Sequence, residues 1–203
     1  MIPSIYPFNT RLNILNSEKK KWIRTRPKGV TIHDAADRDV SRVISWLNQK
    51  NLGYHFIIDR DGSIIQTFYL DSRIDHSGNA RWNDLSPNRH HISICLMSWG
   101  KLIHNRDKFY AWNGDKIEES EVVQRPNFIG LNGMYDPATK EQEESLMKLL
   151  LWIVSFEIDP SNICGHDECC IPQGRKQDPG GMLSLSTEAI RNFLLGEKPW
   201  DKS

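Results

Sequence analysis

Histidine and aspartate side chains occur at three places in the chain where they could do chemistry. His33 follows an apolar strand pattern, His166 lies in the run Gly165-His166-Asp167-Glu168, and Asp178 lies in the run Lys176-Gln177-Asp178-Pro179-Gly180. Imidazole and carboxylate groups bind metal ions and transfer protons. Taken singly, each residue has an ordinary structural explanation, because a histidine often ends a strand and an aspartate before Pro-Gly fits a turn.

A second group of potential metal ligands consists of Cys164, Cys169 and Cys170, which lie close to His166. Thiolates bind zinc well, so a structural Cys/His site is one alternative. The spacing is not a repeated Cys-x2-Cys pair, however, and two adjacent cysteines fit poorly around one tetrahedral ion. The cysteines are better explained as small buried residues, reduced in a cytosolic chain.

The elements that must position these residues are predicted from hydrophobic periodicity. Strands are expected at 28–33, 53–59, 63–68 and 91–97, with a hairpin turn at Arg60-Asp61-Gly62. Helices are expected at 37–50, 137–157 and 188–195, and Thr139 with Gln142 forms a capping box at the start of the second. The mixture of strands and helices predicts an α/β fold with a central mixed β-sheet flanked by helices.

The 203 residues suffice for one domain with a sizeable core. Residues 1–27 are predicted to form a basic N-terminal arm that contains the run Lys19–Lys21, and residues 28–203 the domain, with an insertion at about 101–135. Lys+Arg and Asp+Glu both number 26, and this balance argues against a general nucleic-acid binder. No apolar stretch is long enough to cross a membrane and no secretory signal is visible, so synthesis in the cytoplasm is expected.

Taken together and in this order, the motifs closely resemble those of the zinc-dependent N-acetylmuramoyl-L-alanine amidases. This family includes type 2 bacterial and phage amidases and the peptidoglycan recognition proteins. The resemblance runs from about Lys28 to Pro179 and includes Tyr54-His55-Phe56-Ile57-Ile58-Asp59-Arg60-Asp61-Gly62. It implies that one Zn²⁺ lies in a cleft at one edge of the sheet, held by His33, His166 and Asp178. The loop from His166 to Asp178 is slightly longer than in the tightest family pattern.

The resemblance also implies the reaction, which is hydrolysis of the amide bond between N-acetylmuramic acid and L-alanine in bacterial peptidoglycan. Zinc with an open coordination position lowers the pKa of bound water to about 7 and so supplies hydroxide near neutral pH. Peptidoglycan is then the expected partner, reached after release or export of the protein.

Relatives differ in the group that assists the zinc. Some carry a glutamate on the central strand, where this chain has Cys95 in Ile92-Ser93-Ile94-Cys95-Leu96. Short phage amidases of the phage-lysozyme-like branch use a tyrosine and a lysine instead, and these match Tyr54 and Lys176. His76, in His76-Ser77-Gly78, matches a segment beside the substrate, although a loop histidine without such a role fits equally well.

The sequence is compatible with several biological roles. A phage endolysin fits the tyrosine–lysine pattern best, a secreted antibacterial effector also fits, and a recycling enzyme fits less well because the glutamate is missing. The chain could also be a non-catalytic peptidoglycan-binding module or, like some phage amidases that bind and inhibit a polymerase, a regulatory protein. Four aromatic residues near loops could line a glycan groove, but core packing is at least as good an explanation: Trp82, Trp99, Tyr110 and Trp112.

Overall fold

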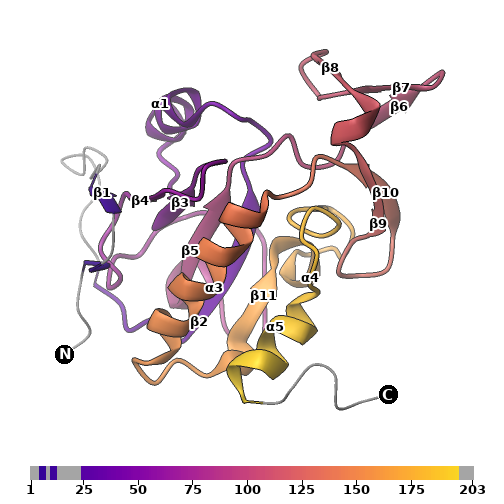
Figure 1. Ribbon diagram of the computed structural model, residues 1–203. Coiled ribbons are helices and arrows are strands. Elements are labelled where there is room, and N and C mark those ends of the chain that lie inside the picture. Colours follow the sequence, from indigo (N-terminus) through magenta and orange to yellow (C-terminus); the bar gives the residue numbers. More distant parts are fainter. Residues whose placement is uncertain (1–4, 8–9, 13–23, 197–203) are drawn as a thin grey trace.

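The computed structural model describes residues 5–7, 10–12 and 24–196, which form a six-stranded sheet with helices on both faces (Figure 1). The strand order is β1-β4-β3-β5-β2-β11, and every neighbouring pair is parallel except the β3–β4 hairpin. This confirms the predicted α/β class with a mixed sheet. The strands are β1 (Thr10–Leu12), β2 (Gly29–Asp34), β3 (Phe56–Ile58), β4 (Ile64–Gln66), β5 (His91–Leu96) and β11 (Ile163–Gly165).

Two apolar layers cover the sheet because successive side chains of a strand point to opposite faces. Phe56 and Ile58 of β3 belong to the larger core under α3 (Lys140–Val154) and α5 (Thr187–Leu194). Ile57 belongs to the smaller core under α1 (Val40–Lys50), where Val43 and Leu47 pack. The helices packed on both faces therefore fix the position of the sheet edge at which the parallel strands end.

Helix α3 begins three residues later than its apolar pattern suggested. Thr139 is the N-cap, its hydroxyl accepts a hydrogen bond from the Gln142 amide at 3.1 Å, and the Gln142 side chain accepts one from the Thr139 amide at 3.0 Å. This is the predicted capping box. Strand β3 is likewise shorter than the predicted 53–59, because only Phe56–Ile58 pairs with β4 and β5.

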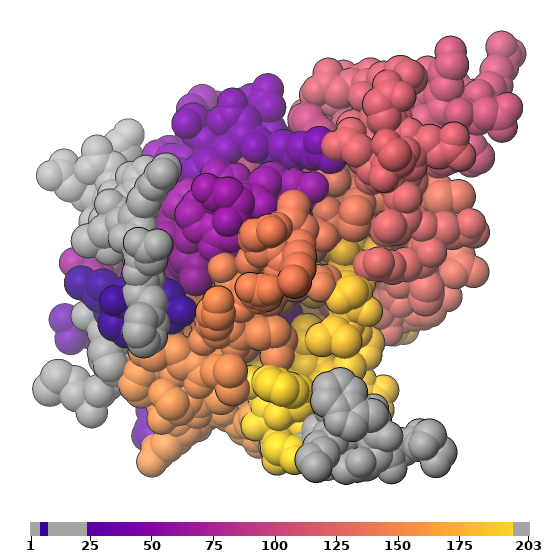
Figure 2. Space-filling model, in the orientation of Figure 1, coloured from indigo at the N-terminus to yellow at the C-terminus, as the bar shows by residue number. Residues whose placement is uncertain are grey.

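Residues 101–135 fold into two small sheets beside the main one (Figure 1), and this part of the chain projects at one corner of the space-filling view (Figure 2). The first contains β6 (Ile103–Asn105), β7 (Lys108–Tyr110) and β8 (Lys116–Ile117), and the second contains β9 (Val123–Pro126) and β10 (Asn132–Tyr135). Leu102, Phe109, Ala111 and Ile117 of this region form a separate apolar cluster together with Trp99. The segment therefore has a small core of its own.

The remaining described elements are short: α2 (Pro87–His90), η2 (Glu119–Glu121), η3 (Pro160–Asn162) and α4 (His166–Cys169). Of the predicted basic arm, the run Lys19–Lys21 lies outside the described residues. In the part of that region that is described, Tyr6 packs into the main core. No helix within the described ranges is long and apolar enough to span a membrane.

Two buried histidines make stability depend on pH. His55 lies between Ser93 Oγ and the Ser72 carbonyl, each 3.0 Å from a ring nitrogen, and burial lowers its pKa to about 4. Burial also lowers the pKa of His91 to about 3. An unfolded histidine has a pKa near 6.5, so the unfolded chain binds more protons below that pH. The free energy of unfolding should therefore fall as the pH is lowered from about 6.5 towards 4.

Urea unfolding at pH 7 and pH 5 measures this effect. The loss of stability between the two pH values should be smaller in His55→Gln and in His91→Gln than in the unchanged chain, because each substitution removes one titrating group. An unchanged loss in both variants would contradict the assignment.

Candidate metal centre and active site

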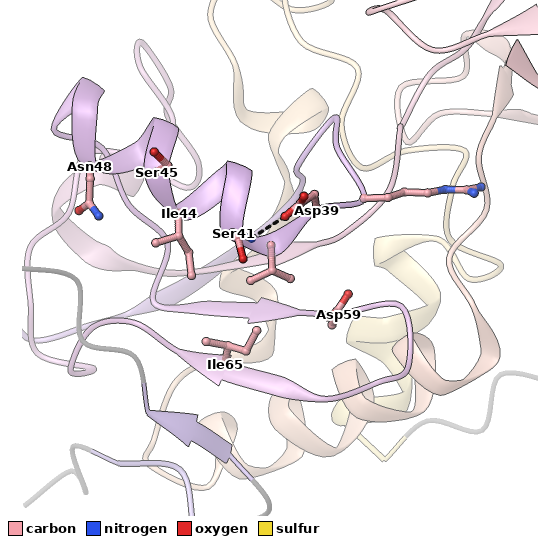
Figure 3. A pocket seen from close by; sticks show the side chains of 9 residues that line it. Asp39, Ser41, Ile44, Ser45, Asn48, Asp59 and Ile65 are labelled. Atoms are coloured by element: carbon pink, nitrogen blue, oxygen red, sulfur yellow. Dashed lines mark hydrogen bonds between the residues drawn. The ribbon is translucent and has the colours of Figure 1, made fainter. Parts of the chain in front are cut away.

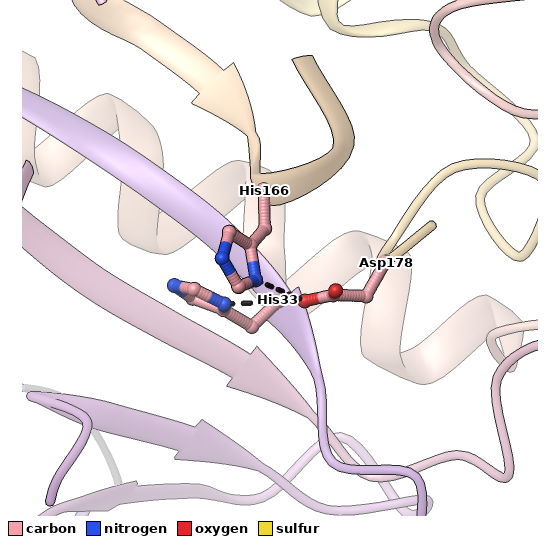
Figure 4. A group of neighbouring side chains, drawn as sticks. All are labelled: His33, His166 and Asp178. Carbon is pink, nitrogen blue, oxygen red and sulfur yellow. Dashed lines mark hydrogen bonds and ion pairs between the residues drawn. The ribbon is translucent and has the colours of Figure 1, made fainter. Parts of the chain in front are cut away.

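Three polar side chains converge at the carboxyl-terminal edge of the sheet (Figure 4). The Nδ1 atoms of His33 and His166 lie 3.2 Å and 2.9 Å from the same carboxylate oxygen, Oδ2 of Asp178. One potential ligand atom from each residue lies within 4.8 Å of the others. Both histidines are buried, and the carboxylate is partly buried.

The fold brings these residues together because β2 and β11 are parallel neighbours. His33 lies near the carboxyl end of β2, and His166 directly follows β11 as the first residue of α4. Parallel strands end at the same edge, so the two imidazoles meet there. Asp178 is held by a backbone hydrogen bond of 2.7 Å from the Asp167 amide to the Asp178 carbonyl. This bond ties the loop that carries Asp178 to the helix that begins with His166.

The two glycines of the motifs have a steric reason. A Cβ atom on Gly165 or on Gly180 would collide with the carboxylate of Asp167. That buried carboxylate accepts a hydrogen bond of 2.9 Å from the Phe128 amide, and burial raises its pKa to about 8. Asp167 thus occupies the space between the two loops that carry His166 and Asp178.

The Nε2 atoms of His33 and His166, which point away from Asp178, both have hydrogen-bond partners. His166 Nε2 lies 3.0 Å from the Ser77 carbonyl, which can only accept, so this nitrogen carries the proton. His33 Nε2 lies 2.9 Å from Nδ1 of His76, and His76 Nε2 lies 3.2 Å from the Pro87 carbonyl. His76 therefore donates through Nε2, and its Nδ1 is the acceptor for two neighbours, His33 Nε2 and the Ser77 hydroxyl, which lies 2.6 Å away. In this arrangement the proton of His33 is on Nε2.

In their neutral forms, both imidazoles consequently turn an unprotonated Nδ1 towards the Asp178 carboxylate. Burial is the largest influence on His33 and lowers its pKa to about 4, so it is neutral at pH 7. Burial alone would raise the pKa of Asp178, and hydrogen bonds and positive charge from His166 and His33 lower it whenever the Nδ1 atoms that face the carboxylate carry protons. Three electron-pair donors facing one another fit a cation between them, and two imidazoles with one carboxylate are a zinc-type donor set.

Tyr54 and Lys176 line the same pocket as the cluster. The Tyr54 and His33 rings are 5.1 Å apart, and burial is the main cause that raises the pKa of Tyr54 well above 10. Cys95 lies opposite His33 in the β2–β5 register and is fully buried. Burial raises the pKa of its thiol well above 9, so Cys95 is protonated at neutral pH and cannot act as a base there.

His76, matched to a segment beside the substrate, lies against the outer nitrogen of His33 and also borders the pocket. Its loop is fixed by Asn88, whose Oδ1 accepts from the amides of His76 and Ser77 at 2.9 Å and 2.8 Å. A hydrogen bond like the one between His76 and His33 orients a metal-binding imidazole and sets its tautomer. The sequence did not indicate this contact, because the two histidines are 43 residues apart.

The cysteine-based metal site is not formed in the described part of the chain. The single group there with metal-binding geometry is His33, His166 and Asp178, and it contains no cysteine. The sulfur atoms of Cys164 and Cys169 lie 3.7 Å from the carbonyls of Val30 and His166. Both side chains are buried, as expected for small core residues.

The pocket around the cluster has a volume of about 670 Å³. Its wall includes two residues to which the sequence had given no role, Trp46 and Arg175. A signal for Trp46 was present, because it lies outside the apolar stripe Val40, Val43, Ile44 and Leu47 of its helix. A second groove, of about 860 Å³, runs along α1 between Asn48 and Asp59 (Figure 3) and contains none of the predicted site residues.

The comparison with family models decides the assignment. The model of the N-acetylmuramoyl-L-alanine amidases, Amidase_2, matches residues 23–181, well over half of the chain. The chain belongs to this amidase family. It is therefore an amidase by class, a hydrolase that acts on a carbon–nitrogen bond.

Solved structures of amidases share the fold of this amidase. A selenomethionine derivative of AmpD matches with a TM-score of 0.56 and 16% identity, over 96% of this chain and 98% of the other. AmiD from E. coli, in complex with anhydro-N-acetylmuramic acid-L-Ala-D-γ-Glu-L-Lys, matches with a TM-score of 0.57 and 22% identity, over 80% and 56%. The endolysin amidase LysCS from Clostridium intestinale matches with a TM-score of 0.55 and 15% identity, over 97% and 100%. A search of curated proteins gave no match.

Proposed function

We propose that this amidase uses zinc to hydrolyse the bond between N-acetylmuramic acid and L-alanine in peptidoglycan, as a lytic enzyme of the endolysin type. The observation that carries the proposal is the convergence of three side chains of the types that bind zinc. The Nδ1 atoms of His33 and His166 both face one carboxylate oxygen of Asp178, and the Nε2 atom of each imidazole has its own hydrogen-bond partner. Such a site is favourable when a cation occupies it.

Zinc would be held by His33, His166 and Asp178. When bound with an open position, it supplies Lewis acidity and an activated water near neutral pH. The contacts of His76 and of the Ser77 carbonyl hold the two imidazoles in the tautomer that binds a metal through Nδ1.

The surrounding residues would then stabilise charge and move a proton. Lys176 carries a cation on the pocket wall and would neutralise the developing oxyanion of the amide. Tyr54 keeps its phenol proton at neutral pH because burial raises its pKa, so it is available to position the water or relay a proton. Cys95 carries no positive charge and, as a protonated thiol, does not accept a proton at neutral pH. This favours the tyrosine–lysine arrangement over the glutamate-assisted one.

The biological setting is part of the same proposal. The fold of this chain is shared with the endolysin amidase LysCS, and the match covers nearly the whole length of both chains. We infer that the protein is made in the cytoplasm, reaches the cell wall after release, and is bacteriolytic and antimicrobial there. A non-catalytic peptidoglycan-binding role is less well supported, because all three metal-binding side chains are present and converge.

The first experiment is a digest of purified peptidoglycan with and without a zinc chelator, followed by mass spectrometry of the soluble products. Free stem peptides that begin with L-alanine are expected, and they should disappear on chelation. Sugar–peptide bonds that stay intact across several wall types would refute the proposed activity.

A further inference from the structure

Two exposed indole rings line the pocket that contains the metal-binding cluster. Trp46 lies on α1 and is 49% exposed, and Trp112 lies in the β7–β8 turn and is 63% exposed. Single exposed apolar side chains are common on protein surfaces. Two indoles on the wall of one functional pocket are a different case, since large aromatic faces that remain open to water are typical of binding sites.

Trp112 is held in a fixed position although it is exposed. Its Nε1 donates a hydrogen bond of 2.5 Å to the carbonyl of Ala36, in the loop that follows β2. Ala36 has a positive φ of 50°, and its amide donates to Asp34 Oδ1 at 3.0 Å. The polar edge of the indole is therefore used within the protein, and its apolar face remains for a ligand.

Two further residues that line the pocket are cationic. Arg175 donates hydrogen bonds to the carbonyls of Ser77 and Asn79 at 3.2 Å and 2.9 Å, and Lys176 lies next to it in the chain. Within the described ranges, neither cation has an ion-pair partner. Arg42, which lies one helical turn from Trp46 on α1, is paired with Asp37 at 2.8 Å, so its charge is compensated.

The two halves of the proposed substrate differ in charge, as the indoles and the cations of the pocket do. The sugar rings carry no charge once the lactyl group is joined to the peptide, and their C–H faces pack against aromatic rings. The stem peptide carries carboxylates: a γ-linked glutamate, as in the ligand bound to AmiD, leaves its α-carboxylate free. Carboxylates favour the side of the unpaired cations.

We propose that Trp46 and Trp112 form a glycan subsite that binds sugar rings of the peptidoglycan strand, with the stem peptide on the side of Arg175 and Lys176. This inference rests on the proposed amidase function. It also gives residues 101–135 a role, since their small core holds Trp112 against the pocket.

Binding is tested with the full-length zinc-loaded protein and peptide-free glycan strands by titration calorimetry. Trp46→Ala and Trp112→Ala should each weaken binding roughly 5- to 10-fold. Trp112→Phe keeps an aromatic face but loses the bond to Ala36, so it should bind better than Trp112→Ala. Phe193→Ala, a change of an exposed aromatic residue outside the pocket, should bind like the unchanged protein. Equal binding by all variants would overturn the proposal, as would a Phe variant as weak as the Ala variant.

Hydrolysis of two matched substrates separates the glycan from the peptide. One is a muramoyl peptide with its sugar, and the other is the same peptide carrying only a D-lactyl group on L-alanine. The tryptophan variants should raise KM for the first and leave KM for the second unchanged. Equal increases for both would place the peptide on the indoles and overturn the proposal. If the unchanged protein cleaves neither substrate, the proposed activity fails, while calorimetry still decides whether the indoles bind glycan.

Discussion

Replacing Asp178 by asparagine should abolish hydrolysis, with a loss of about 10³-fold or more, equivalent to several kcal/mol of lost metal-dependent stabilisation. The substitution preserves shape but removes the negative charge that both imidazoles face at 3.2 Å and 2.9 Å. Without that charge, two neutral imidazoles remain as ligands, and zinc affinity should fall with activity. Metal analysis of the purified variant, together with release of stem peptides from muropeptides, measures both effects.

Two further variants make the result specific to the cluster. Asp178→Cys should recover zinc in part, because a thiolate is also a zinc ligand. Asp84→Asn changes an exposed acid whose partner is Arg81 at the surface, and it should keep both zinc and activity. An Asp178→Asn protein that retains a full complement of zinc and more than a tenth of the activity would refute the assignment.

Replacing Lys176 by alanine, or Tyr54 by phenylalanine, should lower kcat roughly 10²- to 10³-fold while leaving zinc bound. Both residues line the pocket beside the cluster, yet neither belongs to the group with metal-binding geometry. Removing the cation leaves the oxyanion without its counter-charge, and removing the phenol eliminates the proton that burial keeps on Tyr54. Rates on a muropeptide, with zinc content determined in the same samples, distinguish these roles from metal loss.

The matched controls use residues of the same type elsewhere. Lys176→Arg keeps the charge and should retain more activity than Lys176→Ala. Lys140→Ala removes an exposed lysine of α3 and should leave kcat unchanged. Full activity in Tyr54→Phe would remove the tyrosine from the mechanism, and full activity in Lys176→Ala would remove the lysine.

Cys95 limits the chemistry that is available beside His33. It lies opposite His33 in the β2–β5 register, at the position that the sequence resemblance matches to a glutamate. A carboxylate there could accept a proton, whereas the buried thiol stays protonated at neutral pH. The proposal therefore relies on Tyr54 and Lys176, and it distinguishes this amidase from glutamate-assisted relatives.

The sequence by itself predicted the class of fold, which the structure confirms, and the three residues of the candidate metal centre, which the structure brings together. Apolar residues with a period of 2 predicted the buried faces of strands, and those with a period of 3.6 predicted the buried faces of helices. The Thr139–Gln142 capping box indicated the start of α3. His33, His166 and Asp178 were identifiable because each lies in a short local motif. Gly165 is needed locally, since a Cβ there would collide with the nearby Asp167, whereas Gly180 meets Asp167 only in the folded chain.

Only the tertiary structure decided how those residues are held and what surrounds them. The contact of His76 with His33, the bond from His166 to the Ser77 carbonyl and the bond from Trp112 to Ala36 join residues 43, 89 and 76 positions apart. No local pattern encodes such contacts, because they depend on strand order, loop path and side-chain rotamer together. The first two contacts set the tautomers assigned to His33 and His166. The third holds Trp112 at the pocket.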